Sequence, residues 1–413
     1  MEKFSKKIGT IPNDWDFVNA KDCLILESGM RPKEHVTDID TDIPSLGGEN
    51  IDENGFLTFE NVRYISPTYY GKMKKGHIKD EDIYINKDGA NTGKIAFSKK
   101  KPFAECAVNE HVFIIRNNGT FIQQYLFYCL LANFGKQQIL KKIIGSAQEG
   151  INNSFTKGII LPKPSLREQT VIANILSKVD EAIESVKKSI AAAERLKKSL
   201  MQNLLTGKMK TDGTFRIEEE FYDDPKFGKV PVGWEIGRFK KFSILQRGSD
   251  LTDKEVVSGI YPVVKSNGIS IYHNQYFVKP PGVVTGRSGT IGKVFYIEDD
   301  FWAHNTTLYV KDFKNNVPKY IYYLILSMNF ERYYAGTTVP TLNRNDIHKL
   351  KVMIPKTSEE QQKIVSILDA INKIIKDKKD KIHTLERLKK SLMQNLLTGK
   401  VRVGEEFGKK VRK

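Results

Sequence analysis

Two stretches of the chain carry apolar residues at spacings that alternate between four and three. The first has them at positions 172, 176, 179, 183, 186, 190 and 193, and the second at 364, 368, 371, 375, 382 and 385. Only Lys378 interrupts the second stretch. An apolar stripe of this kind, polar on its other side, predicts a long helix that packs against a partner along one seam.

Local chemistry predicts where these helices begin and end. Ser165 with Glu168, and Thr357 with Glu360, have the spacing of a capping box, in which a hydroxyl and a carboxylate satisfy free backbone N–H groups at a helix start. A glycine that can adopt the left-handed conformation follows each stretch. These glycines are Gly207 and Gly399.

The two stretches belong to an internal repeat. The sequence ERLKKSLMQNLLTGK occurs at Glu194–Lys208 and again at Glu386–Lys400, a displacement of 192 residues from 194 to 386. Upstream, Glu-Gln pairs and the apolar positions match at the same displacement, and Pro-x-x-Trp segments open both halves, at Pro12 and Pro231. The repeat therefore predicts two copies of one unit, in the order globular, helix, globular, helix.

Each helix needs a partner for its seam. About 41 residues from Leu166 to Thr206 span roughly 60 Å at about 1.5 Å per residue, and a helix of that length with one apolar stripe is unstable alone. Duplicated units commonly pair about a pseudo-two-fold axis, so we expect the two helices to pair antiparallel, with the globular units at opposite ends. The alternative is that each helix packs on its own globular domain.

The expected fold class is α+β, with two pseudo-symmetric globular domains separated by a pair of long antiparallel helices that form a coiled coil. Strands dominate the globular cores, with short helices expected at Phe121–Phe134 and Tyr320–Phe330. The expected segments are globular domains at 1–164 and 208–356, spacer helices at 165–207 and 357–399, and a basic tail at 400–413.

Composition indicates a polyanionic partner. The chain has 66 Lys and Arg against 49 Asp and Glu, a formal charge of +17 and 40% hydrophobic residues, so it can bury cores and still attract nucleic acid. We find neither a signal peptide nor an apolar run long enough to cross a membrane, and the three cysteines have no paired spacing. A cytoplasmic location is expected.

The sequence contains no recognisable catalytic motif. Gly89-x-x-x-Gly93-Lys94 is one residue short of a phosphate-binding loop and has Ile95 where a Ser or Thr should hold magnesium. We interpret this segment, and its counterpart around Gly292-Lys293, as glycine turns between strands. The seven histidines are scattered without a metal-binding pattern.

Taken together, the motifs resemble the specificity subunit of type I restriction-modification enzymes over essentially the whole chain. The shared signals are Ile11-Pro12-x-x-Trp15 and Val230-Pro231-x-x-Trp234, Gly29 and Gly248, Gly93-Lys94 and Gly292-Lys293, Ile160-Leu161-Pro162 and Ile354-Pro355, and the Glu-Gln pairs at 168 and 360.

The resemblance implies a non-catalytic, sequence-specific DNA-binding subunit. Each globular half would be a target-recognition domain that reads one half of a bipartite, asymmetric double-stranded DNA site, and would direct methylation and restriction by partner subunits. It implies DNA adenine methyltransferase subunits as partners, in two copies, together with restriction or translocase subunits. No cofactor or metal is expected in this chain; S-adenosylmethionine, ATP and magnesium are implied only for the partners.

Loops at four places are the candidates for DNA contact, because Arg suits guanine edges and Asn or Gln suits adenine edges. For any single residue an ordinary turn or helix-cap role is about as plausible, and lysines there favour phosphate. The candidates are Arg31, Lys33, Asn91, Thr92, Lys94, Ser146, Gln148, Asn152, Asn153, Arg247, Lys265, Asn267, Arg287, Ser288, Lys293, Thr337, Thr338, Asn343 and Arg344.

A second hypothesis stays open at this point. The chain could be a coiled-coil structural or adaptor protein without sequence-specific DNA binding, whose positive charge is incidental. Duplex binding that falls steeply with salt would distinguish the two.

Overall fold

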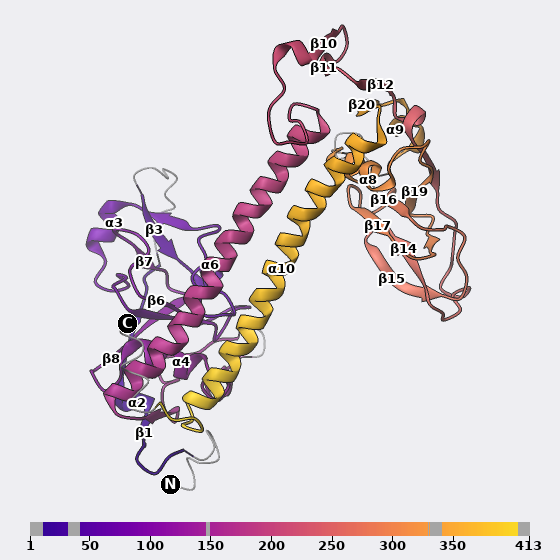
Figure 1. The fold of residues 1–413 in the computed structure, drawn as a ribbon. Coiled ribbons are helices and arrows are strands. Elements are labelled where there is room, and N and C mark those ends of the chain that lie inside the picture. The colour runs from indigo at the N-terminus through magenta and orange to yellow at the C-terminus, as the bar shows by residue number, and fades with distance from the viewer. Residues whose placement is uncertain (1–10, 32–41, 146–148, 329, 331–340, 404–413) are drawn as a thin grey trace. The chain divides into compact units, whose positions relative to one another are not determined.

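The computed structural model describes residues 11–31, 42–145, 149–328, 330 and 341–403. The chain divides into two compact units: unit 1 comprises residues 1–186 and 381–413, and unit 2 comprises residues 187–380. The two long helices are shared between the units. Helix α6 (Leu166–Leu205) begins in unit 1 and ends in unit 2, whereas α10 (Ser358–Leu396) begins in unit 2 and ends in unit 1 (Figure 1).

Unit 1 contains a four-stranded sheet in the order β2-β8-β5-β6, a three-stranded sheet β4-β3-β7 and the pair β1-β9. Its strands are β1 (Asp16–Asn19), β2 (Leu24–Ser28), β3 (Ile43–Leu46), β4 (Arg63–Ile65), β5 (Asp82–Asn86), β6 (Ile95–Ser98), β7 (Ala107–Val108), β8 (Val112–Asn117) and β9 (Ile160–Lys163). Its helices, besides the shared ones, are α2 (Ala20–Cys23), α3 (Pro67–Lys72), α4 (Gln123–Leu131), α5 (Asn133–Leu140) and the 3-10 helix η1 (Gly48–Asn50).

Unit 2 repeats this arrangement with sheets β13-β19-β16-β17 and β15-β14-β18 and the pair β12-β20, and adds the hairpin β10-β11. Its strands are β10 (Phe221–Asp224), β11 (Gly228–Pro231), β12 (Trp234–Arg238), β13 (Ile244–Arg247), β14 (Tyr261–Lys265), β15 (Gly268–His273), β16 (Gly282–Gly286), β17 (Val294–Ile297), β18 (Trp302–Ala303), β19 (Thr307–Asp312) and β20 (Lys351–Pro355). Its helices are η2 (Glu218–Glu220), α7 (Phe239–Phe242), α8 (Pro318–Ser327) and α9 (Arg344–Lys349).

Strand periodicity produces a layered core in each unit. Successive side chains of a strand point to opposite faces, so Ile83 and Ile85 of β5 lie in the core that includes α4, whereas Tyr84 lies in the core beneath the three-stranded sheet. In unit 2, Val283 and Val284 of β16 divide in the same way. The α+β prediction is confirmed, and the predicted glycine turns connect β5 to β6 and β16 to β17.

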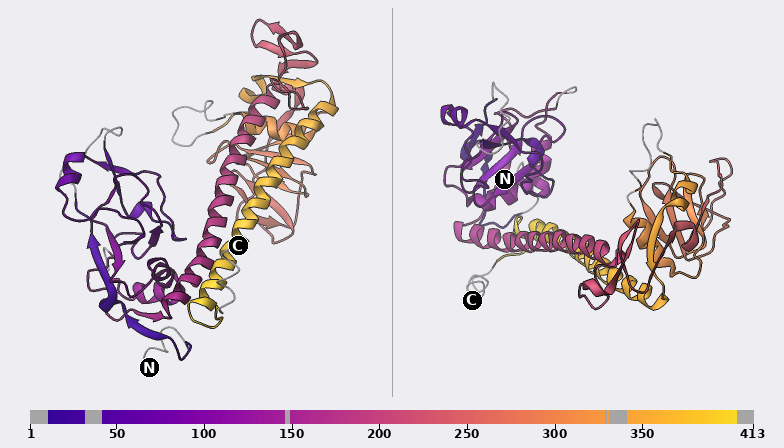
Figure 2. Two further views of the ribbon diagram at one scale, coloured as in Figure 1. Left: turned by 60° about the vertical axis from the view of Figure 1, so that its left-hand side comes forward. Right: turned by 90° about the horizontal axis from the view of Figure 1, so that it is seen from above.

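Within unit 1 the two long helices run antiparallel. Nζ of Lys389 in α10 lies 2.7 Å from Oδ1 of Asp180 in α6, and the later residue Leu396 shares a core with the earlier residue Ile172. As the position in α6 falls, the position of its partner in α10 rises. Figure 2 shows the two helices side by side in both of its views.

Unit 2 shows the same antiparallel pairing. Glu194 of α6 pairs with Lys379 of α10 at 3.1 Å, while the later residue Leu204 lies in a core with the earlier residue Ile364. The prediction of an antiparallel helix pair is therefore confirmed. The alternative, in which each helix packs on its own globular domain, is partly correct as well. The start of each helix also packs on the core of that domain.

The predicted helix ends are correct, but the capping boxes are only half formed. The backbone N–H of Glu168 donates to Ser165 Oγ at 3.3 Å, as predicted. Its carboxylate, however, accepts from Trp15 Nε1 at 3.1 Å and from Arg402 Nε at 2.9 Å. Gly207 and Gly399 follow the helices with φ of +66° and +67°.

The repeat reproduces this arrangement in unit 2. Glu360 accepts from Trp234 Nε1 at 3.0 Å and from Arg216 Nη2 at 2.8 Å. In both units the carboxylate thus ties a helix start to the opening tryptophan of the domain and to an arginine that follows the end of the other helix. Glu168 and Glu360 have tertiary roles that the capping-box prediction omitted.

The short helices also differ from expectation. The helix predicted at Phe121–Phe134 is two helices, because α4 ends before Ala132 and α5 starts at Asn133. The helix predicted at Tyr320–Phe330 begins earlier, at Pro318, and ends at Ser327. Proline is well suited to the first turn of a helix, which explains the earlier start.

Candidate nucleic-acid interface

In unit 2, sheet topology brings two arginines to one edge of the four-stranded sheet. Strands β13 and β16 flank β19 and both run antiparallel to it, so they run parallel to each other and end at the same edge. Arg247 ends β13 opposite Leu308, and Arg287 directly follows β16, whose Gly286 is opposite Thr307. The edge therefore carries one guanidinium group on each side of β19.

The loop that leads into α9 brings a third arginine to this edge. The backbone N–H of Leu342 donates to the carbonyl oxygen of Arg287 at 2.7 Å and fixes the loop against the end of β16. Two residues later Arg344 begins α9, and its Nη1 donates to Oε1 of Gln246 at 2.6 Å. Strand ends and a helix start, both rigid elements, thus position all three guanidinium groups.

These side chains line a cavity of about 400 Å³. Burial lowers the pKa of Arg287, and the charge of Arg247 lowers it further. In the part of the chain that the structure describes, no carboxylate forms an ion pair with these three arginines. The cavity therefore keeps unneutralised positive charge, which suits an anionic or acceptor-rich ligand. The lining residues are Gln246, Arg247, Arg287, Leu308, Thr341, Asn343 and Arg344.

The structure brings together four of the residues selected from the sequence, Arg247, Arg287, Asn343 and Arg344. Asn343 also caps α9, since its Oδ1 accepts from the backbone N–H of Asn345 at 2.9 Å. Only its side-chain NH₂ remains to donate to a ligand. That these residues contact DNA stays a prediction.

The corresponding edge of unit 1 has the same backbone but different chemistry. Ser28 ends β2 opposite Phe113, and Lys87 directly follows β5. The N–H of Ile151 donates to the carbonyl of Lys87 at 2.7 Å, the same loop contact as in unit 2. Nζ of Lys87 donates to the carbonyl oxygen of Glu110 at 2.5 Å and lies 5.5 Å from the centroid of the Phe113 ring. This cation is therefore engaged within the protein.

Unit 1 also places an acid and an imidazole at this edge. Nδ1 of His111 lies 2.6 Å from Oδ1 of Asp88, and its Nε2 lies 3.4 Å from Oε1 of Glu110. Asp88 occupies the position of Ser288 in unit 2, because each forms the single bridge to the loop before the long helix. Unit 1 thus offers acceptors where unit 2 offers arginine donors.

The other candidates of unit 1 lie in turns or at the surface. Oδ1 of Asn152 accepts from the N–H of Ser154 at 2.9 Å, which is an ordinary turn contact. Asn153 is exposed. The exposed Arg31 lies 3.5 Å from Glu110.

The turn between β5 and β6 uses its own polar side chains. Nδ2 of Asn91 donates to the carbonyl of Gly48 at 3.3 Å, and the hydroxyl of Thr92 donates to a carbonyl of the same turn at 2.6 Å. Lys94 lies 3.5 Å from Glu53. Thr92 therefore closes the turn, while Asn91 and Lys94 contact residues outside it, which leaves fewer of these groups for a ligand.

The remaining candidates of unit 2 do not line the arginine cavity. Ser288 bridges to Thr341, while Asn267 and Lys293 are exposed. Lys265 lies close enough to His304 that its charge, after burial, lowers the pKa of that imidazole. The candidates Lys33, Ser146, Gln148, Thr337 and Thr338 lie outside the described residues.

Sequence reasoning missed Lys87, Asp88 and His111 in unit 1 and Gln246 in unit 2. A signal existed, since a basic residue precedes the glycine turn in both units, as Lys87 and Arg287. The glycine turn of unit 1 is one residue longer than that of unit 2, so a comparison aligned on the Gly-Lys pairs does not place Lys87 opposite Arg287. His111 and Gln246 carried no local signal.

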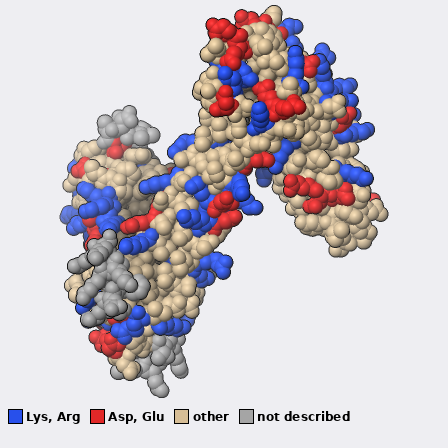
Figure 3. Space-filling model, viewed as in Figure 1, with Lys and Arg blue, Asp and Glu red and all other residues tan. Residues whose placement is uncertain are grey.

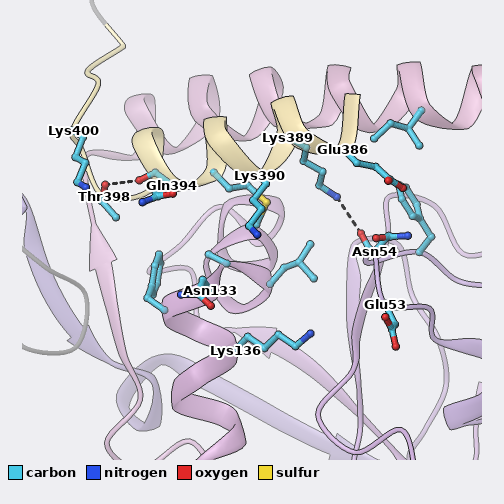
Figure 4. Close-up of a pocket in the computed structure, with 16 residues that line it drawn as sticks. Glu53, Asn54, Asn133, Lys136, Glu386, Lys389, Lys390, Gln394, Thr398 and Lys400 are labelled. Carbon is cyan, nitrogen blue, oxygen red and sulfur yellow. Dashed lines mark hydrogen bonds between the residues drawn. The ribbon is translucent and has the colours of Figure 1, made fainter. Parts of the chain in front are cut away.

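Unit 1 contains a second cavity of about 960 Å³ between the end of α10, the α4–α5 connection and residues 53–56 (Figure 4). It has lysines and glutamates on its walls. The buried lysine, Lys389, donates to the carbonyl of Asn54 at 3.1 Å and pairs with Asp180. Its contacts join the end of α10 to unit 1.

Figure 3 shows Lys and Arg side chains on both units and on the helices, interleaved with Asp and Glu. Among the described residues, no group of three or more His, Cys, Asp or Glu is arranged to hold a metal ion. No helix in the same set of residues is long and apolar enough to span a membrane.

Comparisons with known proteins agree with this arrangement. The family model described as "Type I restriction modification DNA specificity domain" matches residues 12–195 and 231–387. The chain is 28% identical to the "Putative type I restriction enzyme MjaX specificity subunit" of Methanocaldococcus jannaschii, over 97% of each chain.

Two solved structures share the fold. The type I restriction-modification system S subunit from M. genitalium matches with a TM-score of 0.60 at 15% identity, over 94% of this chain and 96% of that one. A chain of a structure on complex assembly and conformational transition of the type I R-M system matches with a TM-score of 0.55 at 16% identity, over 95% and 100%.

Proposed function

This chain belongs to the type I restriction-modification DNA specificity family, and we propose that each of its two units reads one half of a divided, asymmetric DNA site. Recognition of DNA sequence is the role of this family's specificity domain, which occurs twice here. The proposal concerns the division of labour between the two copies.

One observation carries the proposal. The two units hold the same strand edge with the same backbone contact, yet unit 2 has Arg247 and Arg287 there and unit 1 has Ser28 and Lys87. A shared framework with different side chains at one place is what two readers of different sequences require, because base edges are distinguished by donors and acceptors. The two half-sites should therefore differ in sequence.

The helix pair supports a fixed spacing between the half-sites. Helices α6 and α10, of 40 and 39 residues, each pass from one unit into the other, and each measures about 60 Å at about 1.5 Å per residue. That length corresponds to between one and two turns of duplex at about 34 Å per turn. A connection of this length would set the number of unread base pairs.

The chemistry of the complex would come from partners. We propose that the chain is non-catalytic and assembles in the cytoplasm with two adenine methyltransferase subunits and with restriction or translocase subunits. S-adenosylmethionine, ATP and magnesium would be bound by those subunits. The specificity subunit would place the methyltransferases on DNA that its two units have selected.

A footprint on duplex DNA tests this function. The chain, assembled with its methyltransferase subunits, should protect two short segments of its site with a less specific stretch between them. Its affinity should fall steeply with salt, since phosphate contacts release counterions. A single continuous recognition sequence would contradict the divided site, and salt-insensitive or absent binding would favour the structural adaptor instead.

A further inference from the structure

The arginine cavity of unit 2 carries enough chemistry to name the base that it binds. The guanidinium groups of Arg247, Arg287 and Arg344 reach it from the end of β13, the end of β16 and the start of α9. Burial, and after it the charge of Arg247, lowers the pKa of Arg287, so the positive charges in this cavity are held at a cost in free energy. A ligand that accepts hydrogen bonds reduces that cost.

The guanidinium group of Arg344 is fixed in its orientation by a neighbouring side chain. Nη1 of Arg344 donates to Oε1 of Gln246 at 2.6 Å, and the amide is neutral, so the contact orients the guanidinium group without cancelling its charge. A guanidinium group has five N–H donors in a planar fork, and this bond uses only one of them. The remaining donors can form two parallel bonds to one ligand.

Apart from the hydroxyl of Thr341, which can donate or accept, the polar lining of the cavity consists mainly of donors. Arginine side chains cannot accept hydrogen bonds, and the acceptor oxygens of Gln246 and Asn343 already receive bonds from Arg344 and from the start of α9. Guanine presents only acceptors at the purine part of its major-groove edge, namely N7 and O6. Adenine and cytosine both place an amino donor at that edge, and thymine offers one acceptor beside a methyl group.

We propose that the arginine cavity of unit 2 binds the major-groove edge of a guanine, so that the half-site read by unit 2 requires a G·C pair. The proposal rests on the proposed function, because it assumes that this edge of the sheet faces DNA. It assigns Arg247, Arg287 and Arg344 as the residues that determine this specificity.

Unit 1 should not require a guanine at the corresponding strand ends of its own four-stranded sheet. Lys87 follows β5 where Arg287 follows β16, but it donates to the carbonyl of Glu110, and the acceptor Asp88 is the next residue. A carboxylate repels the acceptor edge of guanine. The guanine preference should therefore belong to one half of the site.

A phosphate of the DNA backbone shares the acceptor chemistry of guanine, and the experiment must separate the two. The test uses the chain assembled with its methyltransferase subunits and a duplex that carries its methylated motif. Three duplexes are compared at the proposed pair: the natural G·C, an A·T replacement, and 7-deazaguanine paired with cytosine, which lacks only the N7 acceptor.

Relative to the natural G·C duplex, we expect the wild-type complex to bind the A·T duplex roughly 10- to 100-fold more weakly. Its affinity for the 7-deazaguanine duplex should lie between these two values. Arg287→Gln and Arg344→Gln should bind the three duplexes with nearly equal affinity. Arg344→Lys keeps the charge but not the fork, and should also lose the preference. Arg238→Gln removes an exposed charge of the same unit outside the cavity and should keep the full preference.

Other outcomes overturn the inference. If the arginine variants weaken all duplexes equally, reduce the salt dependence by about one unit per arginine and ignore 7-deazaguanine, the arginines hold phosphate. In that case the proposed function stands and the guanine assignment fails. If the wild-type complex binds no sequence selectively, the proposed function itself fails. Unchanged selection of the unit 1 half-site by each variant shows that the variant is folded.

Discussion

Lys389 and Asp180 form a buried ion pair in unit 1, with Nζ 2.7 Å from Oδ1, and it joins the end of α10 to the start of α6. Tyr128 donates to the other carboxylate oxygen at 2.7 Å. The repeat breaks at this point. The residue equivalent to Lys389 in α6 is Lys197, but Asn372 stands where Asp180 would be repeated.

Replacing Lys389 with Met should destabilise unit 1 by about 3–5 kcal/mol, because it leaves the carboxylate of Asp180 buried without its cation. The matched control is Lys197→Met. Lys197 occupies the same position in the repeated sequence but has no buried carboxylate partner among the described residues, so its loss should cost less than about 1 kcal/mol. Chemical denaturation of the full chain measures both. Equal effects would contradict the role of the pair.

The same variant should acquire a pH dependence. Burial raises the pKa of Asp180 despite the opposing effect of Lys389. A carboxyl group with a raised folded-state pKa makes the folded state less stable as pH rises from about 3.8 through that pKa. Removing Lys389 raises the pKa of Asp180 further. As the pH falls from about 7 to about 5, the free energy of unfolding of Lys389→Met should therefore increase more than that of wild type. Denaturation midpoints at several pH values test this, and no difference in slope would refute it.

Gly399 should tolerate no side chain. Its φ of +67° is unfavourable for other residues, and a Cβ there would overlap Pro12. Gly399→Ala should therefore cost more than the roughly 1–2 kcal/mol of a left-handed residue alone. Gly213→Ala is the control, because its φ is +89° with open space around it. Thermal unfolding of both variants measures the difference, and similar losses would show that the contact with Pro12 is unimportant.

The cysteine thiols should react slowly in the folded chain. Cys23, Cys106 and Cys129 are all buried, and burial with the nearby charge of Asp22 raises the pKa of Cys23 to about 11. At pH 8 the reactive thiolate is therefore scarce and poorly accessible. A colourimetric disulfide reagent should label the three thiols rapidly only after denaturation. Rapid labelling of the native chain would contradict their burial.

Shortening both long helices should shorten the spacer of the DNA site. Deleting one heptad from each, residues 184–190 and 381–387, preserves the seam and removes about 10 Å, or about three base pairs. The deletions lie between the ion pairs Asp180–Lys389 and Glu194–Lys379. The methylated motif should keep both halves and lose about three spacer positions. An unchanged spacer would show that the helices do not set it.

The sequence predicted the long helices well because their signals are local or periodic. The seam of α6, from Ile172 to Ala193, and the terminating glycines all follow rules that operate within a few residues. The repeat then identified the partner of each helix. Glu168 shows the limit of this reasoning, since its partners Trp15 and Arg402 lie far away in the chain.

The arginine cavity was predictable in its members but not in its assembly. Arg247, Arg287 and Arg344 were predicted because each lies in one of the four loops expected to contact DNA and because arginine suits guanine edges. Their convergence depends on β13 and β16 flanking β19, and the contact between Gln246 and Arg344 joins residues 98 positions apart. Strand order is set by tertiary packing, which local propensity does not encode.

The sharpest test of one reader in each unit is methylome sequencing of cells that express the chain with its methyltransferase subunits. We expect methylated adenines within a motif of two unequal halves at a fixed spacing. Replacement of residues 1–164 by the corresponding segment of another specificity subunit should change one half and leave the other intact. A continuous motif, or a change in both halves after that replacement, would contradict the assignment of one reader to each unit.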